Sequence, residues 1–261
     1  MNKRLLQLYR LSINLEKLLF PNFLLSRINI ELFAIDKFVA RVSNLVKPNE
    51  VVLDAGAGSC PYQKYFEHTI YESTDFDDIF DKSHKGQHTF VCNLEKIPKP
   101  KNYYDTIINT QVLEHVEHPQ KVINEFYRIL KPGGKLFLTA PQGYGLHGEP
   151  YNFYNFTKFG LKSLFDTAGF RTIYIEPRGG IFWCLADYIR LLPTYILYQQ
   201  LFTNKTKATF QPNLIAAVIL PFYILLKPIC SYLIPLMFYF LDRLDKKQLF
   251  TLGYNCYCIK G

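Results

Sequence analysis

The chain has 261 residues, of which 49% are apolar, and it carries a formal net charge of +8. A chain of this length and composition can bury a full hydrophobic core without disulfide bonds. Its six cysteines include no Cys-x-x-Cys pair, so the sequence predicts neither a disulfide framework nor a metal site, and it fits a reducing cytoplasm. The lysines are dispersed without a nucleic-acid-binding motif, so we do not expect a nucleic-acid partner.

Two helices are predicted ahead of the first strand, over residues 3–20 and 27–46, because apolar side chains recur there at helical spacing. Pro48 ends the second of them. The N-terminus is basic, but charged residues interrupt its apolar run and no small-residue cleavage site follows, so we expect no secretory signal. We therefore divide the chain into N-terminal helices over residues 1–48 and a main domain over residues 49–261.

The most informative stretch covers residues 51–60 and reads VVLDAGAGSC. An apolar run that ends in a carboxylate, Asp54, and continues into Gly56 and Gly58 is typical of a buried parallel strand that turns tightly and opens a helix. A nucleotide-like ligand can approach bare backbone at such a turn. The third glycine of a dinucleotide fingerprint is replaced by Pro61, and no P-loop ending follows. A nicotinamide-dependent oxidoreductase therefore remains only as an alternative.

Polar residues follow the next predicted strands as well. Asp75 ends an apolar segment and lies 21 positions after Asp54. A carboxylate at that separation can hold both hydroxyls of a ribose. A third and a fourth strand are predicted over residues 90–98 and 104–116. Since open parallel sheets bind ligands at the carboxyl ends of their strands, we expect the nucleotide-like ligand at this edge.

The second half of the domain continues the alternation of helices and strands. A helix over residues 120–130 is predicted to stop at the Lys-Pro-Gly-Gly turn that follows it, and a fifth strand covers residues 135–140. Thr157 is expected to cap a further helix that Gly169 ends, and residues 170–176 read as a sixth strand. This order of elements indicates an α/β protein with a mostly parallel sheet.

Taken in order, the segments VLDAGAG, YESTDF, VCNLEKIP, YDTIINTQVLEHV and LKPGGKLFLTAP resemble the motif series of class I S-adenosylmethionine-dependent methyltransferases. The resemblance is to the branch that includes ubiquinone-pathway and glycan-modifying enzymes, and it covers about residues 30–180 and the last ten residues. It implies a doubly wound, seven-stranded, mostly parallel sheet of the Rossmann-like methyltransferase fold. Residues 252–260 alternate at period two and resemble the seventh strand, which lies beside the sixth. The implied cofactor is S-adenosylmethionine.

Carried over residue by residue, the resemblance implies where the cofactor lies. Its methionine part would lie along the glycine loop, near Asp54 and above Asn109 and Gln111. Its ribose would bind Asp75, and its adenine would lie against Phe76. The implied cofactor-binding residues are Asp54, Gly56, Ala57, Gly58, Asp75, Phe76, Asn93, Leu94, Asn109 and Gln111.

The chain departs from the family pattern at two of its motif positions. The family usually has aspartate where this chain has Asn93. An amide both donates and accepts hydrogen bonds, so adenine recognition is kept while one negative charge is lost. The family often has a third glycine where this chain has Cys60, which bears on the shape of the loop.

The segment over residues 141–156 is rich in glycine and aromatic residues and follows the fifth strand at the expected ligand edge. We interpret it as the acceptor-binding loop. Its His147 is the first candidate for the general base, because an imidazole can take a proton near neutral pH. Tyr151 or Tyr154 would orient the acceptor, and Glu149 would set the tautomer of the histidine.

Other roles remain open for the histidines and for the protein. His147 could instead hydrogen-bond the loop to itself. His115 and His118 compete with it for the role of base, although a Glu-His pair at a helix start more often serves packing and capping. The leading function is in-line methyl transfer to an oxygen or nitrogen of a glycan or lipid-linked acceptor. That preference for a glycan comes only from the resemblance of the loop LHGEPYNFYNFT. A non-catalytic scaffold that binds the cofactor is a further alternative.

An apolar insertion is predicted over residues 181–250. Within it, residues 214–241 have Lys227 as their only formal charge and a proline at every seventh position, 221, 228 and 235. A bilayer span needs about 20 apolar residues, so the length suffices once, although a cation lies at its centre. The prolines are expected to kink a helix repeatedly.

The predicted seventh strand constrains how this insertion can meet a membrane. If that strand pairs beside the sixth, both ends of the insertion lie on the same side, and two crossings need about 40 apolar residues. We therefore expect an interfacial or re-entrant helical pair at the inner, cytoplasmic face of the membrane, where the net charge of +8 favours anionic lipid. A helical lid or a dimer contact without lipid is the alternative, and the sequence leaves the oligomeric state open.

Overall fold

The computed structural model describes residues 29–76, 88–201 and 214–261, so the helix predicted over residues 3–20 lies outside the described residues. The chain separates into two compact units. The sheet unit comprises residues 34–178 and 251–261, and the insertion unit comprises residues 1–33 and 179–250. All of the predicted site residues belong to the sheet unit.

The sheet unit is built on one seven-stranded sheet with the order β3-β2-β1-β4-β5-β7-β6. Strands β1 to β5 pair in parallel, and β7 pairs antiparallel with both β5 and β6. The predicted mostly parallel sheet, with the last strand beside the sixth, is therefore confirmed. The strands are β1 Val51–Ala55, β2 Ile70–Asp75, β3 Phe90–Val91, β4 Tyr104–Thr110, β5 Leu130–Pro141, β6 Phe170–Pro177 and β7 Gly253–Lys260.

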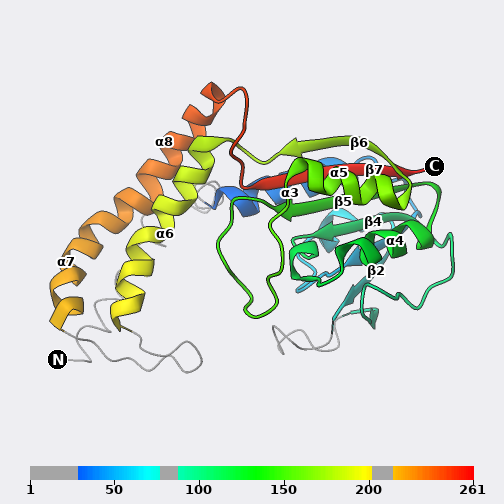
Figure 1. Ribbon diagram of the computed structural model, residues 1–261, viewed down its shortest axis with the longest axis horizontal. Coiled ribbons are helices and arrows are strands. Elements are labelled where there is room, and N and C mark those ends of the chain that lie inside the picture. Colours follow the sequence, from blue (N-terminus) through cyan, green and yellow to red (C-terminus); the bar gives the residue numbers. More distant parts are fainter. Residues whose placement is uncertain (1–28, 77–87, 202–213) are drawn as a thin grey trace. The chain divides into compact units, whose positions relative to one another are not determined.

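Helices cover both faces of this sheet. Neighbouring side chains along a strand point to opposite faces, and here both faces carry apolar side chains that need to be buried. Val52 packs in a buried cluster with residues of α3 (Ile30–Ser43), which belongs to the sheet unit from Ala34 onward. Its neighbour Leu53 packs in a second cluster with residues of α4 (Pro119–Ile129) and α5 (Lys158–Ala168). Figure 1 shows α4 and α5 on one side of the sheet and α3 on the other. The sheet unit therefore has three layers.

The ends of α5 follow the sequence signals. The hydroxyl of Thr157 accepts a hydrogen bond from the Gly160 amide at 3.1 Å, and Gly169 ends the helix with φ = 93°. The Lys-Pro-Gly-Gly segment does not follow its sequence signal, because β5 already begins before it, at Leu130, which pairs with Tyr104 of β4. The register between β4 and β5 then shifts, and the pairing resumes at Lys135. The predicted turn is thus an irregularity inside a longer strand.

The glycine loop does not open an α-helix. It is followed by the short 3₁₀-helix η1 (Gln63–Tyr65). Cys60 has a left-handed φ of 54°, and Pro61 has no amide hydrogen, so a regular helix cannot run through these two residues. The sequence prediction was wrong at this point, and ligand binding here cannot depend on a long helix dipole.

The insertion unit contains two helical arms. The first arm is α6 (Ile181–Leu201), and the second consists of α7 (Leu214–Pro228), the π-helix η4 (Ile229–Leu233) and α8 (Ile234–Leu241). Figure 1 shows α6 lying beside α7 and α8, and α6 contacts both of them. The described helix over residues 220–244 is long and apolar enough to cross a membrane, and 17% of its most apolar window is buried.

The second arm stays helical through its prolines. A proline lacks the amide hydrogen that an α-helix needs, and the π-helical turn lies between Pro228 and Pro235. Where the arms meet the rest of the chain, the carboxylate of Asp242 accepts hydrogen bonds from the amides of Gly180 and Trp183 at 2.9 to 3.1 Å. These bonds satisfy amides at the start of α6 and join the two ends of the insertion.

Candidate functional site

The loop after β1 exposes its main chain because it carries no large side chains. Gly56 and Gly58 both have positive φ, 80° and 51°, which favours glycine. The amides of Gly56 and Ala57 donate to the Thr74 carbonyl at 2.8 and 3.1 Å, which ties the loop to β2. A Cβ atom at position 56 would lie 2.3 Å from a methyl carbon of Val112. The loop can therefore exist in this form only with glycine at position 56.

Asp75 lies at the same loop, as its predicted role requires. It ends β2, and its two carboxylate oxygens accept hydrogen bonds from the amides of Gly58 and Phe76, each at 2.7 Å. Each carboxylate oxygen can accept a further bond, so the hydroxyls of a ribose can still be bound. The ring of Phe76 is 52% exposed, which leaves it open to a planar ligand. The ribose and adenine roles of these two residues stay predictions that their positions support.

Asp54 lies below the loop and is fully buried. One carboxylate oxygen accepts a hydrogen bond from the Tyr71 hydroxyl at 2.6 Å, whereas the other has no hydrogen-bond partner among the described residues. Burial raises the pKa of Asp54 to about 7, with a smaller contribution from the charge of Asp75. A buried carboxylate with an unused acceptor is stabilised by a nearby positive charge. This environment fits a cationic ligand above the loop.

Of three further predicted cofactor residues, Asn109 and Leu94 are buried and Asn93 is exposed. Asn109 is fully buried, and its amide nitrogen donates to the Ala55 carbonyl at 2.8 Å, which holds the end of β1 against β4. Leu94 is 6% exposed and packs in the core, so its side chain is not available to an adenine. The Asn93 side chain accepts a bond from the Glu95 amide at 2.8 Å on the exposed surface. Of these three, only Asn93 presents its side chain toward solvent.

Gln111 contacts a buried cation that the sequence interpretation missed. It has a left-handed φ of 54°, and its amide donates to the Thr139 carbonyl at 3.1 Å. When its side-chain oxygen faces Arg178, that oxygen lies 3.1 and 3.3 Å from the guanidinium nitrogens. Arg178 is 2% exposed and donates to the Tyr254 carbonyl at 2.8 Å.

The position of Arg178 depends on a contact with Gly253, which is distant from it in the sequence. A Cβ atom at Gly253 would lie 2.3 Å from both a guanidinium nitrogen of Arg178 and the Ala140 carbonyl oxygen. The absence of a side chain at position 253 therefore lets Arg178 cross β7. Arg178 follows β6 and Gly253 begins β7, and no local pattern in the sequence connects them.

The predicted acceptor loop is anchored to the segment that follows β4. The amides of Phe153 and Tyr154 donate to the main-chain carbonyl of Glu114 at 2.8 and 3.3 Å. The Tyr154 hydroxyl donates to the carbonyl of Glu117 at 3.0 Å, so this tyrosine fixes the loop. The loop is thus held at the carboxyl edge of the sheet, where a nucleotide-like ligand was expected.

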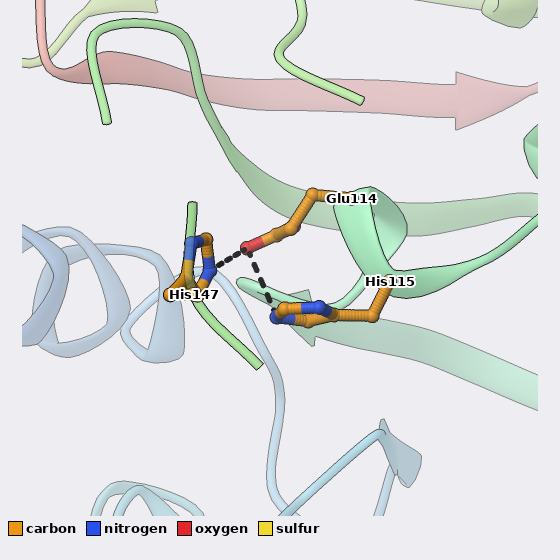
Figure 2. A group of neighbouring side chains, drawn as sticks. All are labelled: Glu114, His115 and His147. Carbon is orange, nitrogen blue, oxygen red and sulfur yellow. Dashed lines mark ion pairs between the residues drawn. The ribbon is translucent and has the colours of Figure 1, made fainter. Parts of the chain in front are cut away.

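A cluster of one acid and two histidines lies between these segments (Figure 2). Glu114 and His115 come from η3 (Leu113–His115), and His147 comes from the acceptor loop. One carboxylate oxygen of the fully buried Glu114 lies 3.9 Å from the Nε2 atom of each histidine. The ring centroids of the two histidines are 4.8 Å apart, and the ring of Tyr144 is 5.0 Å from that of His147.

Two sequence predictions concern this cluster. The Nδ1 atom of His147 lies 3.0 Å from the Gly145 carbonyl, which favours the tautomer with hydrogen on Nδ1. Glu149 is exposed, and its predicted role toward His147 stays a prediction. His115, which competes with His147 for the role of base, lies beside it. Its pKa is lowered mainly by burial, and the charge of His147 lowers it further. Tyr151 contacts His115 through its main-chain carbonyl, at 2.6 Å.

The sequence signal for this cluster was present but could not be placed. Glu114 and His115 are neighbours in the segment VLEHV, which was assigned to the end of the fourth strand. Their partner His147 is distant in the sequence, and only the folded loop brings it to them. The structure therefore places two groups of residues at one edge of the sheet: the glycine loop with Asp75, and the histidine cluster.

Comparison with known proteins agrees with this arrangement. The family described as "Methyltransferase domain" matches residues 53–138, which hold most of the sheet from β1 to β5. The mitochondrial ubiquinone biosynthesis O-methyltransferase of Mus musculus is 37% identical over 66 residues, which are 25% of this chain and 17% of that protein. The ubiquinone/menaquinone biosynthesis C-methyltransferase UbiE of Pseudomonas aeruginosa is 32% identical over 84 residues, 31% of this chain and 33% of that protein. This chain thus spans a third or less of these relatives.

Solved structures show the same fold. A SAM-dependent methyltransferase from Archaeoglobus fulgidus superimposes with a TM-score of 0.53 at 16% identity, over 89% of this chain and 95% of that one. The [4+2]-cyclase SpnF superimposes with a TM-score of 0.50 at 16% identity, over 86% and 80% of the two chains. At such identities the superpositions establish the fold alone, and the cyclase shows that this fold is not restricted to one reaction.

Several independent observations agree. The matched family covers the strands that carry the glycine loop, and the sheet is seven-stranded and mostly parallel with its last strand beside the sixth, as the motif series implies. The site itself offers a cationic nucleoside ligand bare main chain, the ribose-binding candidate Asp75 and the buried acid Asp54. Residues 53–138 thus match the methyltransferase-domain family, and the sheet unit has the fold of the S-adenosylmethionine-dependent methyltransferases, which implies S-adenosylmethionine as the cofactor.

Proposed function

We propose that the protein transfers the methyl group of S-adenosylmethionine to an oxygen, or a nitrogen, of a small-molecule or lipid-linked acceptor. When bound, the cofactor supplies a methyl group on a positively charged sulfur. The observation that carries the proposal is the histidine cluster at the sheet edge that also holds the glycine loop and Asp75. A bound acceptor would then lie between a methyl donor and a base.

In this reaction the site aligns the two reactants, and a histidine of the cluster takes the proton. As the acceptor oxygen bonds to the methyl carbon, the carbon–sulfur bond breaks and its electron pair stays on sulfur. The acceptor proton passes to a histidine of the cluster, with His147 as the first candidate. Alignment of the two reactants can supply about 7 to 11 kcal/mol where the geometry is ideal. A positioned base adds roughly 10²- to 10⁴-fold.

The direct test uses cofactor whose methyl group is isotopically labelled. The purified protein is incubated with that cofactor and a membrane extract, and the products are identified by mass spectrometry. We expect label in an O- or N-methylated product, and none with a His115→Asn/His147→Asn double variant that still binds S-adenosylhomocysteine in calorimetry. Binding without transfer to any extract would favour the scaffold alternative. A melting-temperature shift with a nicotinamide cofactor but not with S-adenosylhomocysteine would favour the oxidoreductase.

The insertion unit supports a membrane-associated acceptor. Large apolar side chains on the second arm are exposed, including Phe222 at 62%, Leu225 at 66% and Leu233 at 63%. Two charged side chains of the same two arms are buried, Asp187 at 2% and Lys227 at 9% exposure. Soluble proteins rarely expose large apolar patches, and charges in contact with lipid are costly. This distribution fits helices that face lipid.

We infer that these arms contact the inner face of the membrane peripherally or as a re-entrant pair. Hydrogen bonds between Asp242 and the start of α6 hold the two ends of the insertion together, so both ends lie on one side of any bilayer. A lipid-linked glycan or another lipid-linked acceptor would then be presented at the membrane surface. A helical lid or a dimer contact is the competing explanation of the apolar surface.

Vesicle flotation separates these explanations. The protein, prepared without detergent, is mixed with vesicles of neutral lipid or of neutral lipid with anionic lipid. We expect it to float with the vesicles, more strongly with the anionic ones. The variant Phe222→Lys/Leu225→Lys should lose flotation, whereas Phe159→Lys should not, since Phe159 is 79% exposed on α5 of the sheet unit. Sedimentation as a dimer without vesicle binding would contradict the membrane proposal.

A further inference from the structure

Gln111 is held at the carboxyl edge of the sheet, next to the glycine loop. It follows β4 directly, has a left-handed φ of 54°, and its amide donates to the Thr139 carbonyl of β5 at 3.1 Å. The next residue, Val112, fills the space beside Gly56, where it would meet a Cβ atom at 2.3 Å. A left-handed conformation of a residue other than glycine persists where surrounding contacts fix it. The main chain therefore places the Gln111 side chain at the cofactor half of the site.

The side-chain amide of Gln111 is oriented by its neighbours. One end of the amide lies 3.1 and 3.3 Å from two guanidinium nitrogens of Arg178, and 3.0 Å from the Thr139 hydroxyl. A guanidinium only donates hydrogen bonds, so the amide atom that faces it is the oxygen. The amide nitrogen is then at the other end, where none of the residues that the structure describes accepts a bond from it. Because Gln111 is half-buried, this nitrogen can donate to a ligand.

Arg178 is held in place by contacts other than the one with Gln111. Its side chain is 2% exposed, and its guanidinium donates to the Tyr254 carbonyl at 2.8 Å and to the Ala140 carbonyl at 3.4 Å. Its main-chain amide donates to the Gly253 carbonyl at 2.8 Å. The ends of β5 and β7 thus fix the guanidinium, and the amide of Gln111 must adapt to it.

The charge of Arg178 acts on the segment that follows the glycine loop. The pKa of Tyr62 is raised to about 12, mainly by burial and further by the charges of Asp36 and Asp54, whereas the charge of Arg178 lowers it. A negative and a positive group therefore both act on this part of the cofactor half. An amino-acid head group carries an ammonium and a carboxylate, and it is complementary to such a pair. Asp54 suits the ammonium, and a donor supported by Arg178 suits the carboxylate.

We propose that Arg178 is a positioning residue, which holds the Gln111 side chain as a hydrogen-bond donor to the carboxylate of the cofactor's methionine part. This inference rests on the proposed function, because it concerns the cofactor of that reaction. Arg178 acts through Gln111 by fixing the orientation of its amide. An amide whose oxygen accepts a bond from a cation is also polarised, which strengthens its N–H group as a donor.

Calorimetry with two ligands that differ in the carboxylate alone tests this contact. S-adenosylmethionine and decarboxylated S-adenosylmethionine share the adenosine, the sulfonium and the amine. We expect the natural protein to bind the decarboxylated compound more weakly. Gln111→Leu should weaken the binding of S-adenosylmethionine roughly ten- to a hundredfold and leave that of the decarboxylated compound unchanged. An equal loss for both ligands would mean that Gln111 only shapes the loop, and it would overturn the proposal.

Gln111→Glu tests the orientation of the amide, because it replaces the outward nitrogen with an oxygen of similar size. The inward oxygen keeps its contacts with Thr139 and Arg178, so the melting temperature should not fall. The outward oxygen repels a carboxylate, and S-adenosylmethionine should bind more weakly than to Gln111→Leu. Gln63→Glu adds the same charge at an exposed position of η1 and should leave this affinity unchanged. Normal affinity in Gln111→Glu would show that no donor acts at this position.

A double-mutant cycle tests whether Arg178 acts through Gln111. Arg178→Met removes the donors and should weaken the binding of S-adenosylmethionine about as much as Gln111→Leu does. The combined variant should show no further loss, because the two residues serve one contact. If Arg178→Met does not fold, Arg178→Lys replaces it in the cycle, since lysine keeps the charge without the planar fork. Losses that add in the combined variant would contradict the positioning role.

Failure of this inference is distinguishable from failure of the proposed function. A natural protein that binds neither S-adenosylmethionine nor S-adenosylhomocysteine in calorimetry would contradict the proposed function. A natural protein that binds S-adenosylmethionine, with Gln111→Leu and Arg178→Met binding it equally well, would contradict only the role of these two residues.

Discussion

The cofactor half and the acceptor half of the site are built in different ways. The glycine loop and Asp75 lie close in the sequence, and their contacts run mainly between a main chain and an adjacent strand. The acceptor half instead depends on side chains, with Glu114 and His115 from one segment and His147 from a distant loop. The first half follows from a local pattern, whereas the second exists only in the folded chain. Substitutions in the two halves should therefore fail differently.

The largest effect is expected at Gly56. A valine there would place its Cβ atom 2.3 Å from a methyl carbon of Val112 at a φ of 80°, so the loop must move. We expect calorimetry to detect no binding of S-adenosylhomocysteine by Gly56→Val. In the matched variant Gly58→Ala, no atom lies within 4 Å of the new Cβ, and only the left-handed φ costs about 1–2 kcal/mol. Normal binding by Gly56→Val would contradict the cofactor assignment.

The acceptor half should respond to His147→Asn in the opposite way. This variant removes the first-candidate base and leaves the glycine loop intact. We expect kcat to fall about 10²- to 10⁴-fold while the dissociation constant of S-adenosylhomocysteine stays unchanged. Stopped assays with labelled cofactor and calorimetry on the same preparation give both numbers. An equal loss in cofactor affinity would show that the two halves are not separable.

This contrast explains what the sequence could predict. The strand before the glycine loop and the pairing of the seventh strand with the sixth follow from short patterns, VLDAGAG and the period-two alternation of residues 252–260, and both are confirmed. The α-helix predicted after the glycine loop does not form, because Cys60 and Pro61 prevent it. The sequence offered Glu149, which is near His147 along the chain, and did not indicate Glu114, which lies near it in space. Local patterns indicate backbone geometry, and they do not indicate which distant side chains meet.

A substitution at Gly253 tests a contact between distant parts of the sequence, the one between Gly253 and Arg178. In Gly253→Ala the new Cβ atom would lie 2.3 Å from both the Ala140 carbonyl oxygen and Arg178. Forcing it in should lower the free energy of unfolding by about 1–3 kcal/mol, as overpacking usually does. Chemical denaturation should show this loss, and Gly145→Ala should not, because no atom lies within 4 Å of its Cβ. Unchanged stability in Gly253→Ala would mean that Arg178 is not held across β7.

The smallest effect concerns charge in the cofactor half. Burial raises the pKa of Asp54 to about 7, so this group is partly protonated at neutral pH. A positively charged ligand favours the ionised form, and the affinity for S-adenosylmethionine should therefore rise between pH 6 and pH 8, by at most about tenfold per pH unit. Asp54→Asn should remove this dependence. S-adenosylhomocysteine, whose sulfur is neutral, should show a weaker dependence in the natural protein.

The same raised pKa has an opposite consequence for the empty protein. The folded pKa of Asp54 lies above the ordinary value of 3.8, so the folded state binds the proton more tightly than the unfolded state. The contribution of this group to stability is therefore present below about pH 4 and is lost as the pH rises toward 7. Asp54→Asn without ligand should lose less stability over this range in thermal unfolding. If the variant kept the full pH dependence of both affinity and stability, the charge below the glycine loop would have another source.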